Sequence, residues 1–205
     1  MFYTHVHMGM NTKIFLITAI VLVMTMMVSA QTDGHEFSGF LQQHINHQKT
    51  GMIILGSWGL GNALTGGIGG LRANGENKYF HQMNLGWGLV NAAIAGFGYY
   101  SAARMGSDIS GTVDLLQANQ SLQKTLLVNA GLDVAYMMGG LYLMERSRRP
   151  DVNQDRLKGF GKSIIMQGAF LLVFDGVMAW NFNRNGKEMI EFIAAPGGLG
   201  LSITF

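Results

Sequence analysis

The chain has 205 residues, of which 48% are hydrophobic and only 13% are charged. Soluble domains carry about 25% charged residues, so this composition favours a membrane protein. A formal net charge of +2 gives no basis for nucleic-acid binding, and the absence of cysteine excludes disulfides, thiolate metal sites and a cysteine nucleophile. The 29 glycines, with only 2 prolines, are typical of closely packed membrane helices.

The first predicted element is an export signal over residues 1–30. A lysine precedes an apolar run over residues 14–28, and the small residues VSA end the run as a cleavage site. Met10 begins this signal better than the first methionine does, which makes residues 1–9 an over-extended start. The alternative is an uncleaved anchor helix. After cleavage, the polar residues 31–48 would form an exported N-terminal segment.

Four charge-poor segments of about 20 residues follow, each bracketed by basic residues. At about 1.5 Å per residue, this length matches a hydrocarbon core about 30 Å thick. The four predicted spans are residues 51–71, 83–103, 125–144 and 163–182. The sequence therefore predicts an all-α membrane bundle of four transmembrane helices over residues 49–184, followed by an exported tail over residues 185–205.

Two segments outside the spans leave alternatives open. Residues 108–124 repeat apolar side chains at helical spacing, so they form either an amphipathic surface helix or an extension of the third span. Residues 200–205 alternate strictly and end on phenylalanine, which resembles the terminal strand of an outer-membrane barrel. Because the spans themselves have helical periodicity, an outer-membrane-associated protein is only the third alternative.

The distribution of basic residues predicts the topology. If the export signal places residue 31 outside, eight basic residues lie in the inner segments and five in the outer ones, in agreement with the positive-inside rule. The inner segments carry Arg72, Lys78, Arg146, Arg148, Arg149, Arg156, Lys158 and Lys162, and the outer segments carry Lys49, Arg104, Lys124, Arg184 and Lys187. We therefore expect a multi-pass protein of the inner (plasma) membrane, with both mature termini outside.

The second span has a small or polar stripe beside a bulky apolar one. We expect Gly88 and Ala95 to lie in a helix–helix contact, while Trp87 and Ile94 face lipid. Further pairs of small residues spaced by four predict close helix packing. These pairs are Gly59 and Ala63, Gly66 and Gly70, Ala92 and Gly96, Gly131 and Ala135, and Ala135 and Gly139.

The same span carries a resemblance to a family. The sequence KYFHQMN over residues 78–84, continued by Trp87, Asn91 and Gly98, resembles an uncharacterised family of small multi-pass membrane proteins from Gram-negative bacteria. The resemblance covers roughly residues 48–180. It implies a multi-pass helical fold and carries no known activity.

Polar side chains inside the predicted spans are the strongest functional signal, because such residues are costly in hydrocarbon and normally face the bundle interior. Counting along antiparallel spans places Asn62, Asn91 and Gln167 at one depth, and Asp133 and Asp175 at another. The complete candidate cluster is Asn62, His81, Asn84, Asn91, Asn129, Asp133, Tyr136, Gln167 and Asp175.

The two carboxyl groups have a further consequence. Two carboxylates close together in a low dielectric cannot easily both ionise, so we expect the pair Asp133 and Asp175 to hold at least one proton at neutral pH. Asn129 and Tyr136 are candidate hydrogen-bond partners. Such a pair serves either as a hydrogen bond between helices or as a site for a proton, a cation or a small ligand.

These features favour a non-enzymatic membrane protein, either a scaffold or assembly component or a carrier of protons or small ligands. The alternative is an intramembrane enzyme that uses Asp133, Asp175 and His81 for acid–base chemistry. Expected partners are the lipid bilayer and either a second copy of the chain or another membrane protein.

Histidines offer weak candidates for a metal site. His44 and His47 are three residues apart, so they lie on one helical turn and could share a metal ion. The simpler interpretation is a polar segment near the membrane surface. His47 and His81 begin antiparallel spans at opposite faces, which argues against a haem held between them, and no cofactor is expected.

Overall fold

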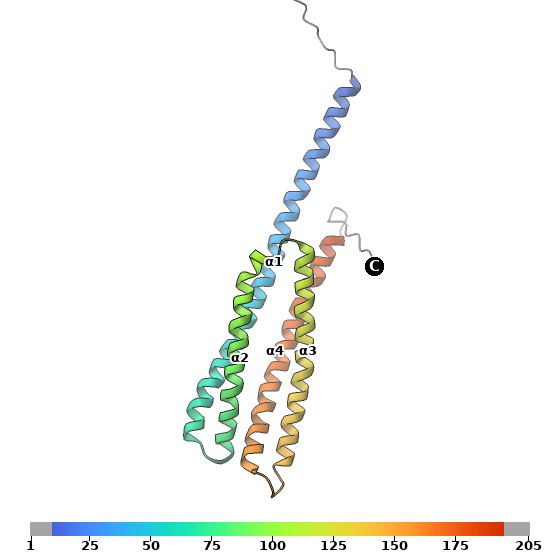
Figure 1. The fold of residues 1–205 in the computed structure, drawn as a ribbon. Helices are drawn as coiled ribbons and strands as arrows, with labels where there is room; N and C mark the ends of the chain where they lie inside the picture. The colour runs from blue at the N-terminus through green and yellow to red at the C-terminus, as the bar shows by residue number, and fades with distance from the viewer. Residues whose placement is uncertain (1–9, 195–205) are drawn as a thin grey trace, which may run out of the picture.

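The computed structural model describes the backbone of residues 10–194 and the side chains of residues 36–194. This part of the chain forms four helices, α1 (Met10–Arg72), α2 (Gly75–Asp108), α3 (Thr112–Arg146) and α4 (Gln154–Ala194). They pack as an antiparallel bundle, beyond which the N-terminal part of α1 extends as a single helix (Figure 1). The prediction of an all-α four-helix bundle is confirmed.

The helices are longer than the predicted spans. α3 begins at Thr112, so the connection over residues 108–124 is largely an extension of the third helix, and its side chains Leu115 and Asn119 are buried. α4 continues to Ala194 and buries Met189. The over-extended start at residues 1–9 and the alternation at residues 200–205 lie outside the described residues.

Local chemistry explains where two of the helices begin and end. Gly75 has a φ of 57°, a left-handed conformation that glycine adopts without steric cost, and this allows a short turn between α1 and α2. Pro150 lies between α3 and α4, where its missing N–H prevents the helix from continuing. The Asn153 Oδ1 accepts a hydrogen bond of 2.9 Å from the Arg156 N–H and so caps the start of α4.

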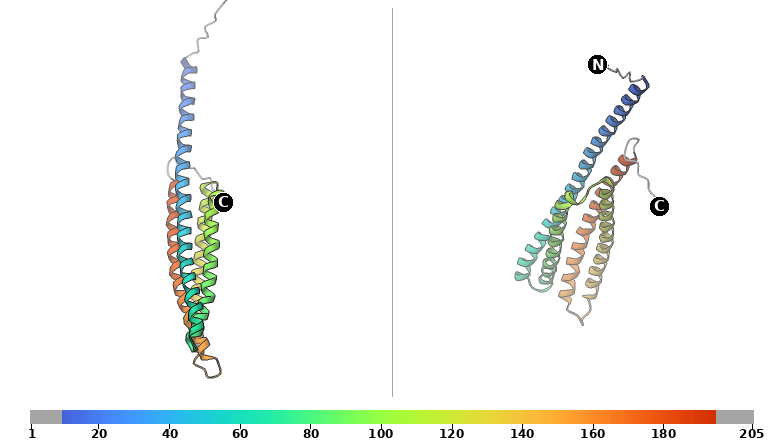
Figure 2. Two further views of the ribbon diagram at one scale, coloured as in Figure 1. Left: turned by 90° about the vertical axis from the view of Figure 1, so that its left-hand side faces the viewer. Right: turned by 45° about the horizontal axis from the view of Figure 1, so that its top comes forward.

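The bundle consists of two helical hairpins. α1 packs along α2, α3 packs along α4, and the hairpins meet mainly through α2 and α4. No Cα atoms of α2 and α3 lie within 8 Å of each other in the described helices. The right-hand view in Figure 2 shows the same arrangement of two adjacent pairs. One side of the bundle, between α2 and α3, is therefore closed only by side chains.

Glycines allow the backbones of α1 and α2 to touch. A Cβ atom on Gly59 would lie 2.8 Å from the Gly88 carbonyl oxygen, and one on Gly66 would lie 2.6 Å from the His81 carbonyl oxygen. The predicted contact at Gly88 is therefore confirmed, and Ala95 is buried as expected. Close approach of this kind is how helices associate where no hydrophobic force drives them together.

The other predicted pairs of small residues differ in outcome. Gly59, Ala63 and Gly66 lie in the contact between α1 and α2, as predicted, and Ala92 also meets Gly59 there. A Cβ atom added to Gly96, Gly131 or Gly139 would meet no atom of another helix within 4 Å among the described residues, so these three glycines do not mediate helix contacts there, contrary to the prediction. The close approach of α3 to α4 is made instead at Gly140 and Gly161, where a Cβ atom on Gly161 would lie 2.6 Å from the Gly140 carbonyl oxygen. Spacing alone identifies a small stripe but not the side on which the neighbouring helix lies.

Of the two α2 residues predicted to face lipid, one is exposed and the other is partly covered. Ile94 is 53% exposed, as expected. Trp87 is only partly exposed, because its ring lies 5.2 Å from the ring of Tyr136 on α3, in an edge-on contact. These two aromatic rings bridge the gap between α2 and α3.

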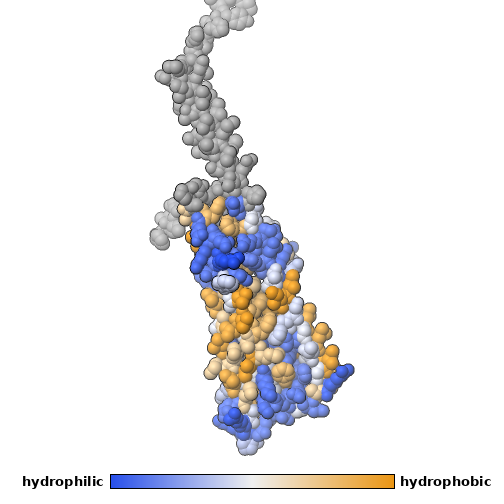
Figure 3. All heavy atoms as spheres, turned by 180° about the vertical axis from the view of Figure 1, so that it is seen from behind, coloured by the Kyte–Doolittle hydropathy of each residue, from blue (hydrophilic) through white to orange (hydrophobic). Residues whose placement is uncertain are grey.

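The bundle buries an apolar cluster that includes Leu126, Phe174 and Phe182, but it also buries many polar side chains and exposes many large apolar ones. The buried polar residues include Asn62, Asn84, Asn91, Asp133, Ser163, Gln167 and Asp175. The exposed large apolar residues include Ile53, Leu60, Leu64, Ile68, Phe97, Leu127, Val128, Met138, Leu141, Val173 and Trp180. Seen from behind, an apolar band lies between hydrophilic surfaces at the two ends of the bundle (Figure 3).

Candidate functional site

The first cluster of buried polar groups is centred on Gln167, whose side chain on α4 is fully buried. Its Nε2 donates to the Asn62 Oδ1 at 2.9 Å and to the Asn84 Oδ1 at 3.1 Å. Its Oε1 accepts a hydrogen bond from the Trp58 Nε1 at 2.8 Å and a long one from the Asn91 Nδ2 at 3.5 Å. The donors and acceptors of the Gln167 amide are therefore all used.

Two more hydrogen bonds complete this amide network. The Ser163 Oγ donates to the Asn84 Oδ1, and the Asn62 Nδ2 donates to the Trp58 carbonyl oxygen at 2.8 Å. The network connects α1, α2 and α4 and involves no residue of α3. Trp58 and Ser163 were not among the sequence-predicted residues, although each lies one helical turn before a predicted partner, Asn62 or Gln167.

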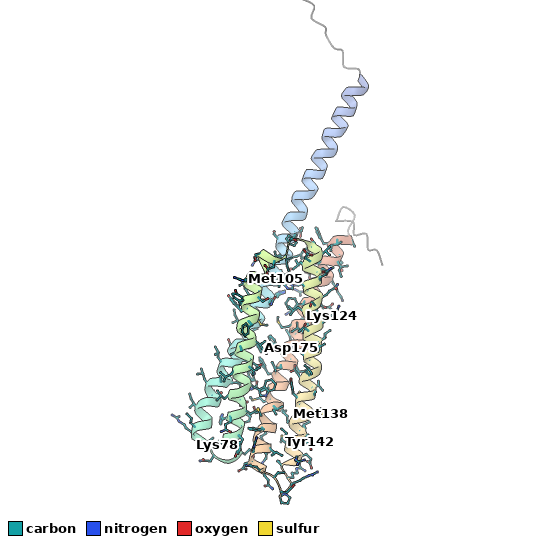
Figure 4. All side chains as sticks on the ribbon, viewed as in Figure 1. Lys78, Met105, Lys124, Met138, Tyr142 and Asp175 are labelled. Carbon is teal, nitrogen blue, oxygen red and sulfur yellow. The ribbon has the colours of Figure 1, made fainter. Side chains whose placement is uncertain are left out.

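The second cluster is the carboxyl pair Asp133 and Asp175, which interact with each other between α3 and α4. Their side chains are only 3% and 5% exposed. The Asp133 Oδ2 has no hydrogen-bond partner within the described part of the chain. Figure 4 shows Asp175 near mid-height of the bundle, with Lys78 towards one end and Lys124 towards the other.

A cavity of about 190 Å³ contains both carboxyl groups. Asn129 and Tyr136, the candidate partners from the sequence, lie at its exposed rim, and neither forms a hydrogen bond to a carboxyl group among the described residues. The complete lining is Leu55, Trp87, Val90, Asn91, Ile94, Asn129, Leu132, Asp133, Tyr136, Leu171, Phe174 and Asp175.

His81 lies apart from the carboxyl pair. It lines a separate cavity of about 390 Å³ beside Asn62 and Asn84, and its Nδ1 is buried without a hydrogen-bond partner in the described structure. The structure therefore does not bring His81 into the cavity that holds Asp133 and Asp175. Acid–base chemistry shared by these three residues has no geometric support.

A third polar layer lies towards the N-terminal side of the bundle and contains both histidines of the weak metal candidate. The His44 Nδ1 donates to the Asn119 Oδ1 at 3.3 Å, because the Asn119 Nδ2 itself donates to the Phe182 carbonyl oxygen. The His47 Nδ1 instead accepts a hydrogen bond of 2.9 Å from the Asn185 Nδ2. No group of three or more metal-ligating side chains occurs among the residues that the structure describes.

Charged groups pair at the opposite end. Glu76, at the start of α2, forms ion pairs with Lys158 at 2.8 Å and with Lys162, both on α4. The hydrogen bonds from Lys158 and Lys162 hold the pKa of the Glu76 carboxyl below its ordinary value. These ion pairs link the two hairpins at this end of the bundle.

Comparison with known proteins identifies a family. Residues 54–176 match the model of a family of unknown function, DUF6992. This region includes the whole amide network and the carboxyl pair. No curated protein and no solved structure gives a significant match.

Proposed function

The chain belongs to the DUF6992 family of unknown function, and we propose from its own geometry that it is a non-enzymatic integral membrane protein. The observation that carries this proposal is the number of large apolar side chains on the surface of a bundle that has polar groups buried inside it. A helix in water buries its large apolar side chains, whereas a helix in lipid exposes them and turns its polar groups towards its neighbours. The apolar band in Figure 3 supports this placement in a bilayer.

The lengths of the helices support the proposal. α3 and α4 are long and apolar enough to cross a membrane, and only 17% and 44% of their apolar windows are buried, unlike the core helix of a soluble protein. The described parts of α1 and α2 do not reach the same hydropathy, and glycine is frequent in both. We nevertheless propose that all four helices cross the membrane. The close glycine contacts hold α1 against α2, and both pack in one bundle with α3 and α4.

Aromatic and basic residues suggest where the membrane interfaces lie. At one end, the Lys49 Nζ lies 5.7 Å from the centre of the Tyr99 ring. At the other end, the Arg146 guanidinium donates a hydrogen bond of 3.3 Å to the Tyr142 hydroxyl. Lys124 and Tyr142 are separated along α3 by about 27 Å at about 1.5 Å per residue, close to a hydrocarbon thickness of about 30 Å.

The proposed location is the inner membrane of a Gram-negative bacterium, with the loop between α3 and α4 inside and both mature termini outside. The excess of basic residues near Arg146 and Lys162 supports this orientation. Alkaline carbonate extraction of membranes tests the membrane association. The protein should stay in the pellet, whereas release into the supernatant would reject integral insertion.

Within this class, we propose that the protein carries protons or small ligands at the carboxyl pair. The supporting observation is the Asp133 Oδ2, which is buried without a partner inside a cavity. The second candidate, a scaffold or assembly component, is favoured by the amide network, in which Gln167 uses all its hydrogen-bonding groups. A scaffold should tolerate Asp133→Asn, because an amide can still form hydrogen bonds.

Infrared difference spectra test whether the carboxyl pair takes up and releases protons, as the carrier role requires. For the protein in lipid vesicles, a carboxyl C=O band that changes between pH 5 and pH 9 should be lost in Asp175→Asn. Asp151→Asn, in the exposed loop, is the control and should retain the band. Asp133 and Tyr136 of α3 and Asp175 of α4 are the titratable groups that line the cavity, and α1 and α2 contribute none. Absence of such a band would leave the scaffold role.

A further inference from the structure

The cavity around the carboxyl pair is accessible from outside the bundle. It lies where the backbones of α2 and α3 are apart and only side chains such as Trp87 and Tyr136 meet, and its lining comes from all four helices. Val90, Ile94 and Leu132 at its rim are each about half exposed. A molecule could therefore enter between α2 and α3 without separating either helical hairpin.

The interior of this cavity has acidic groups and no countercharge. None of the lining residues is a lysine, an arginine or a histidine. Asp133 is 3% exposed, and its Oδ2 has no hydrogen-bond partner in the described chain. A buried carboxyl oxygen without a donor is unfavourable, so this atom is the natural acceptor for a donor supplied by a ligand.

The walls limit what that ligand can be. Leu55, Leu171 and Phe174 are apolar, and the Trp87 and Tyr136 rings meet 5.2 Å apart between α2 and α3. A bare Ca²⁺ or Mg²⁺ ion needs about six or more oxygen ligands, which two carboxyl groups in an otherwise largely apolar cavity do not supply. An apolar body with one cationic group matches both the walls and the carboxyl pair.

We infer that this cavity binds a small organic amine in its protonated form. The ammonium N–H groups donate to the carboxyl oxygens of Asp133 and Asp175, while the hydrocarbon part contacts Leu55 and Phe174. A volume of about 190 Å³ limits the ligand to roughly the size of benzylamine. This inference rests on the carrier role proposed above and names its ligand class.

The test compares benzylammonium with benzyl alcohol, which has nearly the same shape but no charge. Binding is measured by isothermal titration calorimetry on the full chain in detergent, at neutral pH. We expect saturable binding of benzylammonium at least tenfold tighter than that of benzyl alcohol. Asp133→Asn and Asp175→Asn should each weaken benzylammonium binding at least tenfold, whereas Asp151→Asn should leave it unchanged.

Three results would overturn the inference. Equal binding of benzyl alcohol would mean an apolar cavity only. Saturable binding of sodium or calcium chloride alone that depends on Asp133 and excludes benzylammonium would mean an inorganic cation site. If no probe bound to the folded, unsubstituted protein, the carboxyl pair would bind no amine, and protons would be the only ligand left for the proposed carrier role. Because the comparison of benzylammonium with benzyl alcohol uses the unsubstituted chain in detergent, it remains informative if a variant does not fold, and it is independent of the membrane-extraction result.

Discussion

The Gln167 Nε2 on α4 donates a hydrogen bond of 2.9 Å to the Asn62 Oδ1 on α1, although 105 residues separate the two along the chain. The same amide group also binds Asn84 on α2. One side chain therefore joins three helices inside the bundle, at a level where the outer surface is apolar. A polar group in this position fixes both the depth and the rotation of each helix.

We predict that Gln167→Met destabilises the bundle by about 2 kcal/mol, because it removes four hydrogen bonds that are worth about 0.6 kcal/mol each in membrane proteins. Val173→Met, at an exposed position of the same helix, is the matched control and should have little effect. Thermal or chemical unfolding in detergent measures the difference. Equal stability of the two variants would mean that the amide network contributes no net stability.

The contact between α1 and α2 gives a prediction with opposite signs at two glycines of one helix. Gly88→Ala should destabilise the protein by about 1–3 kcal/mol, since a Cβ atom there would lie 2.6 Å from the Gly59 carbonyl oxygen. Gly86→Ala should instead stabilise it by about 0.5–1 kcal/mol, because Gly86 has open space and alanine favours a helix. Unfolding in detergent measures both, and destabilisation of similar size at the two sites would contradict the packing.

The depth of the polar residues could be predicted from the sequence because a helix rises regularly. Counting residues along antiparallel spans was enough to place Asn62 and Gln167 together, as it was for Asp133 and Asp175. The rotation of one helix pair against the other could not be predicted in the same way. It depends on which side chains interlock, so the Trp87–Tyr136 contact and the gap between α2 and α3 become visible only in the structure.

Ser163 and His81 also show that the packing of one helix against another could not be predicted from the sequence. Ser163 joins the amide network because Asn84 of another helix faces it, and its own segment gives no sign of this. His81 shares the polar stripe of Asn84, yet it lines a different cavity from the carboxyl pair. The stripe to which a residue belongs shows on which face of its helix it lies. Whether that residue takes part in a site depends on which helix packs against that face.

The ion pairs of Glu76 give a prediction about pH. The lysines lower the folded-state pKa of Glu76, so their stabilising effect is present above its ordinary pKa of 4.5 and is lost as the pH falls through the lower, folded-state value. Glu76→Gln should therefore lower the melting temperature at pH 7, and this deficit should shrink as the pH falls below 4.5. Glu145→Gln, in a largely exposed pair with Arg148, should have little effect at any pH in this range. A deficit in Glu76→Gln that stays the same size as the pH falls would contradict this account.

The continuous helix α1 bears on the predicted export signal. Its two apolar stretches, residues 14–28 and 51–71, have centres about 40 residues apart, or about 60 Å along a helix. A hydrocarbon core about 30 Å thick cannot hold both on one straight helix. We therefore predict cleavage after Ala30, so that mass spectrometry of the membrane-extracted protein finds an N-terminus at Gln31. An intact residue 14–28 segment would instead indicate an anchored protein.

Thiol labelling tests the placement across a membrane most directly, and the absence of native cysteine leaves no background. Ser121→Cys on α3 and Asp151→Cys in the loop before α4 are both at exposed positions, whereas Ser147 is buried and unsuitable. In intact spheroplasts, an impermeant maleimide should label position 121 but reach position 151 only after permeabilisation. Equal labelling of both positions before permeabilisation, or of neither, would contradict a bundle that crosses the inner membrane.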